Sequence, residues 1–195
     1  MLLAIGLTVL AGSAAAKDQQ VLADKVVRLH VVANSDTAED QAVKLQVRDA
    51  VAQYTEQVLR SCSNREEAQR RLCDLLPELN RLVEDTVRQQ GYTYDTSVVL
   101  GQAAFPTKTY DGFALPAGEY MALRVLLGEA EGQNWWCVVF PPLCAAAAGE
   151  VSVAAAGAGL SEEEIHLITE DSAGYVIKFK TIELWQKLRL AMKET

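Results

Sequence analysis

Few side chains in this sequence have the chemistry of general acid–base or nucleophilic catalysis. His30 lies within an apolar run, and His166, the second of two histidines, lies in a short polar segment. Ser35 and Asp36 follow His30 closely, so a hydrolase using His30 with Ser35 or Asp36 is one hypothesis. A helix cap explains Ser35 and Asp36 better, and no nucleophile elbow, zinc-protease motif or phosphate-binding loop is present. We therefore predict no catalytic residue, no metal and no cofactor, and we keep the hydrolase as the alternative.

The cysteines indicate disulfide chemistry more than metal binding. The chain has four of them, at positions 62, 73, 137 and 144, and none has the Cys-x-x-Cys spacing of a zinc ribbon or a thioredoxin-like site. Cys137 and Cys144 bracket a segment with two prolines that can fold back, so we predict that they form a disulfide bond. Cys62 and Cys73 either join two helices or remain as free thiols.

The segment from Asn134 to Cys144, NWWCVVFPPLC, concentrates residue types that are common at protein interfaces. Adjacent tryptophans on a strand point to opposite faces, so one of Trp135 and Trp136 can enter the core while the other stays near the surface. Exposed tryptophans are frequent hot spots of binding. We predict a partner-binding surface there, with the polar residues before the first helix as a second patch. The alternative is that the tether or the C-terminal helix covers both tryptophans. The candidate residues are Trp135, Trp136, Phe140, Pro141, Pro142, Asn34, Ser35 and Asp36.

The first half of the chain is expected to be one strand followed by helices. Val26 to Ala33 is short, β-branched and apolar, which is typical of a buried strand. Asp36 to Glu39 has the spacing of a helix cap, and apolar residues then recur at helical spacing to about Leu59. A second cap signal at Ser63 opens another helical stripe, which Pro77 interrupts, so we predict two helices or a kink there.

After Gly91 the apolar period changes to that of strands. Residues 97–102, 118–127 and 134–140 are expected strands, with 129–133 as a hairpin loop. Residues 145–159 are rich in alanine and glycine, which predicts a loop or tether. A strand at 175–180 and a C-terminal helix at 182–192 complete an α+β fold with an N-terminal strand, a helical hairpin kinked at Pro77 and a mainly antiparallel sheet.

Composition limits the classes of partner. Half of the residues are hydrophobic and 23% are charged, which fits a globular protein of one domain, here residues 17–195. The net charge is −8, and the sequence has no basic stripe of the kind that binds nucleic acid. We therefore expect no nucleic-acid partner and no small-molecule substrate.

The N-terminus has features of an export signal. Leu2 to Gly12 is an apolar run too short to span a membrane, and small residues follow it. Residues 1–16 are thus expected to be a signal peptide cleaved between Ala16 and Lys17. Retention as an N-terminal membrane anchor, or burial as a helix, are the alternatives. Only Met1 precedes the apolar run, which leaves the export route open.

Several segments of the sequence resemble the stage II sporulation protein R family of endospore-forming bacteria, and they occur in the same order as in that family. The similarity lies in residues 28–51 (RLHVVANSDTAEDQAVKLQVRDAV), 99–110, 115–125 and 134–144, with YVIKFKTIEL near the end. Family members are exported from the forespore into the space between the two membranes. There they activate a membrane-embedded aspartic protease that processes the sigma-E precursor. The resemblance implies that this chain is a signalling protein and that its partner is that protease.

Overall fold

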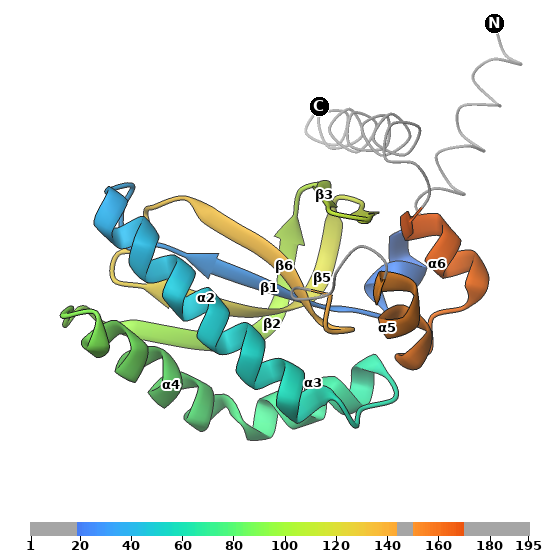
Figure 1. The fold of residues 1–195 in the computed structure, drawn as a ribbon, viewed down its shortest axis with the longest axis horizontal. Coiled ribbons are helices and arrows are strands. Elements are labelled where there is room, and N and C mark those ends of the chain that lie inside the picture. The colour runs from blue at the N-terminus through green and yellow to red at the C-terminus, as the bar shows by residue number, and fades with distance from the viewer. Residues whose placement is uncertain (1–18, 144–149, 170–195) are drawn as a thin grey trace, which may run out of the picture.

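The central strand of the protein is β1 (Val27–Val32), which is buried along its whole length. The computed structural model describes residues 19–143 and 150–169, and Figure 1 shows their arrangement. A four-stranded sheet has the order β2-β5-β1-β6, formed with β2 (Thr96–Phe105), β5 (Gly118–Leu127) and β6 (Asn134–Phe140). The sequence prediction of a buried strand before the first helix is confirmed.

The sheet is mainly antiparallel. β5 pairs with β2 and β6 pairs with β1 in antiparallel register, whereas β1 and β5 run parallel. A parallel pair needs a long crossover connection, and the helices between β1 and β2 lie within it. The short strands β3 (Lys108–Tyr110) and β4 (Phe113–Leu115) form a separate two-stranded sheet.

The hairpin expected at residues 129–133 is wrong. β5 and β6 are consecutive in the chain, but β1 lies between them in the sheet. Residues 128–133 therefore pass over the end of β1, and a backbone hydrogen bond joins Gly132 N to Ala33 O. Turn residues between two strands do not reveal whether a third strand enters between them.

Three helices follow β1, as the periodicity and the caps predict: α2 (Ala38–Leu59), α3 (Arg65–Asp74) and α4 (Leu76–Gln89). Each N-cap lies one residue after the predicted one: Thr37, not Asp36, caps α2 by accepting a hydrogen bond from Asp40 N, and Asn64, not Ser63, caps α3 by accepting from Glu67 N. The helical run breaks at Leu75, and Pro77 lies in the first turn of α4, where its missing N–H does no harm. The predicted break near Pro77 is confirmed.

The two faces of the sheet differ. Helices α2 and α4 cover one face, as Figure 1 shows, and apolar residues such as Leu29, Val47, Val83 and Leu123 fill the interface. Among the described residues no helix of this kind covers the centre of the opposite face, which is packed with aromatic side chains around Arg28 and His30. The fold is α+β, as expected.

The loop expected at residues 145–159 is wrong for its second half. Helix α5 (Val151–Gly157) lies there, followed by α6 (Glu162–Thr169). Val151 and Ala155 are buried one helical turn apart, so small side chains let this helix pack closely despite the low complexity of its sequence. The expected signal segment, the residues at 144–149, the strand at 175–180 and the helix at 182–192 lie outside the described residues.

Candidate partner-binding surface

Trp135 lies on the helix-covered side of the sheet, at the start of β6. Its side chain keeps 37% of its surface exposed. The guanidinium carbon of Arg48, on α2, lies 4.4 Å from the centre of the indole ring. A cation over an aromatic face is attracted to the ring, so this contact fixes the orientation of an otherwise exposed tryptophan.

Trp136 points to the opposite face, as strand alternation requires. It is half-buried, and its ring stacks on His30 with centroids 3.8 Å apart. The ring of Phe105 approaches edge-on at 4.7 Å. Trp136 therefore belongs to an aromatic cluster, and Trp135 is the more exposed of the pair.

His30 is held in this cluster as a neutral side chain. Burial lowers the pKa of His30 and outweighs the opposing effect of its hydrogen bond to Asn134, while Arg124 lowers the pKa further. Its Nε2 lies 2.5 Å from Asn134 Oδ1. Ser35 instead donates a hydrogen bond to Asp40. Within the described residues no hydrogen bond joins His30 to Ser35 or Asp36, so the structure does not assemble the alternative triad.

Arg28 is the second polar residue beneath the aromatic cluster. It is fully buried, and its guanidinium lies 4.2 Å from the Phe105 ring centre and 4.9 Å from that of Tyr120. Its Nη2 donates to the Tyr110 hydroxyl at 2.6 Å. None of the ion pairs found among the described residues involves Arg28, so the cation is stabilised by aromatic rings, the Tyr110 phenol and the Cys137 carbonyl, which accepts from Arg28 Nε at 3.5 Å. The apolar strand pattern gave no sign of this role.

The second predicted patch, Asn34–Asp36, joins two loops at one end of the sheet. Asn34 Oδ1 accepts from Glu129 N at 2.9 Å, and Asp36 Oδ1 accepts from Gln133 N at 2.7 Å. Gly132 packs so closely on the Ser35 carbonyl that no Cβ fits between them. These contacts fix the start of β6 and hence the backbone that carries Trp135.

Two buried charged residues of α2 complete this corner. The carboxylate of Asp40 accepts hydrogen bonds from Asn34 at 2.8 Å and from Ser35. Burial alone would raise the pKa of Asp40, but the hydrogen bonds from Ser35, Asn34 and Thr37 hold it below its usual value. Lys44 Nζ donates to the Gln133 carbonyl at 3.1 Å, and burial lowers its pKa despite the opposing charge of Asp36.

We call the exposed part of this corner the Trp135 surface, formed by Trp135, Arg48 and the Asn34–Asp36 loop. The structure places Trp135 close to Asn34–Asp36, which the sequence analysis predicted as a separate patch. Arg48 was not predicted, because a lone arginine on a solvated helix carries no sequence signal for an aromatic partner. The hydrogen bonds from Glu129 N and Gln133 N tie Asn34 and Asp36 to the segment before β6.

The remaining candidates lie elsewhere. Phe140 and Pro141 are buried and Pro142 is half-buried at the opposite end of β6. With a rise of about 3.3 Å per residue, Phe140 lies roughly 17 Å from Trp135 along the strand. The surface predicted around residues 135–143 is therefore not one continuous patch, because Trp135 and Phe140 lie near the two ends of β6.

The cysteines are only partly described. Cys62 and Cys73 are free, with Cys62 buried and Cys73 exposed, so of the two alternatives for this pair the structure has the free thiols. Burial raises the pKa of Cys62, as does the nearby Glu67. Cys144 lies outside the described residues, and its pairing with Cys137 stays a prediction.

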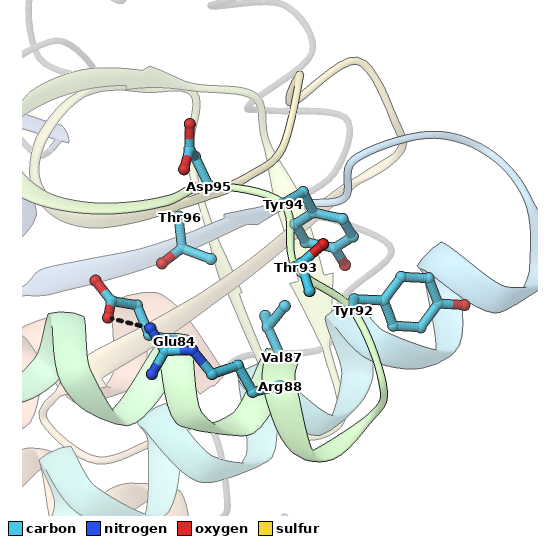
Figure 2. A pocket seen from close by; sticks show the side chains of 8 residues that line it. All are labelled: Glu84, Val87, Arg88, Tyr92, Thr93, Tyr94, Asp95 and Thr96. Carbon is cyan, nitrogen blue, oxygen red and sulfur yellow. Dashed lines mark hydrogen bonds and ion pairs between the residues drawn. The ribbon is translucent and has the colours of Figure 1, made fainter.

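A pocket of about 310 Å³ lies between the end of α4 and the start of β2, as Figure 2 shows. Glu84 and Arg88 form an ion pair at its wall, with 3.2 Å between Arg88 Nη2 and Glu84 Oε2. The hydroxyls of Tyr94 and Thr96 are buried without a hydrogen-bond partner among the described residues. Burial raises the pKa of Tyr94 to about 12, so it remains a neutral phenol. The pocket is polar but contains no histidine, cysteine or lysine in its lining.

Two other properties of the described residues bear on function. No cluster of histidine, cysteine and carboxylate side chains there has the arrangement of a metal site. Among the same residues, no helix combines the length and apolar character needed to cross a bilayer.

Comparison with known proteins gives one family. The family model for stage II sporulation protein R (spore_II_R) matches residues 23–150. The chain is also 40% identical over 124 residues to the stage II sporulation protein R of Bacillus subtilis (strain 168). That alignment covers 64% of this chain and 55% of the relative, so the chain spans about half of the relative's length. No solved structure matches.

Proposed function

The chain belongs to the stage II sporulation protein R family, and we propose that within this sporulation role it is an exported signal that activates a membrane-embedded aspartic protease. The protease would then process the sigma-E precursor, as the resemblance implies. In this proposal the chain leaves the forespore and meets the protease in the space between the two membranes. Its contribution is binding, and the chemistry belongs to the protease.

The observation that carries the proposal is the Trp135 surface. Its tryptophan keeps 37% of its surface exposed, yet the ring is held by Arg48 and the backbone by the Asn34–Asp36 loop. An anchor that is rigid before binding loses little conformational entropy on docking. Such aromatic anchors, together with arginine, are the residues that dominate binding energy at interfaces.

A reconstitution tests the proposal. The chain, the candidate protease and the sigma-E precursor are co-expressed, and precursor cleavage is followed with and without the chain. We expect cleavage only when all three are present, and much weaker cleavage with Trp135→Ala. Cleavage that proceeds equally without the chain would contradict the proposal.

The exported hydrolase remains the second candidate, and the buried neutral His30 is the observation that makes it worth testing. His30→Phe separates the two functions, because it removes the imidazole that a hydrolase would need and keeps an aromatic ring against Trp136, away from the Trp135 surface. A signalling protein with this substitution should retain precursor cleavage in the reconstitution after allowance for any loss of stability. A hydrolase would lose its activity while remaining folded.

A further inference from the structure

Strand β2 forms one edge of the four-stranded sheet and is unusually open to pairing. It is ten residues long, with the sequence TSVVLGQAAF. It contains no charged residue and no proline. Proteins commonly use these residues to keep an edge strand from pairing with another chain. An edge of this kind is a template for a further strand.

Two hydrogen-bond patterns show which backbone groups of β2 face outward. The side chain of Asn80, on α4, accepts from Val98 N at 3.0 Å and reaches Val98 O at 3.4 Å. On the inner side, Gly128 N donates to Asp95 O at 2.8 Å. The register with β5 is continuous from Thr96 to Phe105. The N–H and C=O groups of even-numbered residues therefore point away from β5, because the two sides alternate along a strand.

The Asn80 side chain forms hydrogen bonds with the outward backbone groups of one residue, Val98. Beyond it, Leu100, Gln102 and Ala104 present N–H and C=O groups for which the described residues supply no hydrogen bond. Gln102 and Ala104 are exposed, and nothing lies within 4 Å of a Cβ placed on Gly101. The second half of β2 thus has exposed side chains, and its outward backbone groups are unpaired among the described residues.

We propose that the edge of β2 from Leu100 to Ala104 binds an extended segment of a partner protein as an added strand. The inference deepens the proposed function, since it assumes that the chain docks on another protein. Backbone hydrogen bonds would supply the recognition, with small or apolar side chains on the added strand. The chain carries a net charge of −8, which repels a second copy and favours a neutral or basic segment.

A model peptide tests the edge independently of any protease. The probe is a capped peptide of alternating valine and threonine flanked by lysines, and its control carries N-methyl groups on alternate amides. We expect saturable binding of the unmodified peptide to the full chain. Gln102→Pro removes one outward N–H, whereas Gln102→Ala keeps it, so binding should be at least about tenfold weaker for the proline variant than for the alanine variant.

Ala103→Pro tests which N–H groups of β2 point outward, since it removes an N–H that faces β5. It should lower the melting temperature, while Gln102→Pro should nearly preserve it. Equal binding by the Gln102 variants, no binding by the unmodified chain, or equal binding of the N-methylated peptide overturns the inference. Sedimentation that shows a dimer lost in Gln102→Pro overturns it in favour of a second copy. Failure of the precursor-cleavage assay alone counts only against the protease as partner.

Discussion

The Arg48 guanidinium lies 4.4 Å from the centre of the Trp135 ring, so α2 and β6 jointly fix one exposed aromatic side chain. The two residues are far apart in the sequence, and the neighbouring Trp136 lies on the other side of the sheet against His30. Two adjacent tryptophans therefore have different surroundings, one partly exposed beside α2 and one inside the aromatic cluster.

The first prediction compares those tryptophans. Trp135→Ala should abolish most precursor cleavage but cost only about 1 kcal/mol of unfolding free energy, because the ring is exposed and loses mainly the contact with Arg48. Trp136→Ala should cost about 2 kcal/mol, less than the ~3–5 kcal/mol of a fully buried tryptophan, because Trp136 is half-buried. Denaturant unfolding and the cleavage assay measure both. If neither variant reduces cleavage, the Trp135 surface is not the site, and the α2 face becomes the better candidate.

The second prediction concerns Arg48. Arg48→Gln removes the cation from the Trp135 ring and should weaken protease binding about 2–5-fold, which corresponds to ~0.5–1 kcal/mol for an exposed cation–π contact. Arg60→Gln is the matched control, since Arg60 lies at the end of the same helix and pairs with Glu56. Equal effects of the two substitutions would indicate a general charge effect and not a contact with Trp135.

The third prediction tests the close approach between the loops. Gly132→Ala should lower the unfolding free energy by about 1–3 kcal/mol, because the new Cβ would collide with the Ser35 carbonyl and displace the backbone. Gly101→Ala is the control, as its Cβ would enter open space. A chain that tolerates both changes equally would show that the loops can separate without cost.

The fourth prediction is a pH dependence that arises from His30. Burial lowers the pKa of His30 in the folded protein, so the unfolded chain binds a proton more readily. The stabilisation is complete above the unfolded value of 6.5 and is lost as the pH falls through the folded value. His30→Phe keeps an aromatic ring against Trp136 but cannot titrate.

Unfolding at about pH 7.5 and about pH 5.5 measures this effect. The unmodified protein should lose more stability between these values than His30→Phe, by less than the ~1.4 kcal/mol per pH unit that one proton can contribute. Asp40 also destabilises the fold in acid, but only below its usual pKa of 3.8. The same loss in both proteins would assign the pH dependence to other groups.

The fifth prediction is the disulfide bond between Cys137 and Cys144 in the exported protein. Mass spectrometry of unreduced protein should find these two thiols linked, and reduction should lower the unfolding free energy by roughly 2–3 kcal/mol. Cys73 and Cys62 serve as internal references, since both are free and only Cys73 is exposed. Alkylation of Cys137 and Cys144 without reduction would disprove the bond.

The sequence by itself determined the local elements of this protein. The buried strand before Asn34, the helices that follow it and the break near Pro77 agree with the structure. Each depends on residues close together in the chain, through apolar periodicity, caps or the missing N–H of proline. The opposite orientation of Trp135 and Trp136 was predicted for the same reason, since side chains alternate along any strand.

The tertiary structure alone decided how these elements meet. The insertion of β1 between β5 and β6 converted an expected hairpin loop into a crossing over the end of β1. It also placed Asn34–Asp36 beside the start of β6, where Arg48 reaches Trp135. Strand order depends on which faces the helices can bury together, and that is a property of contacts between residues far apart in the sequence.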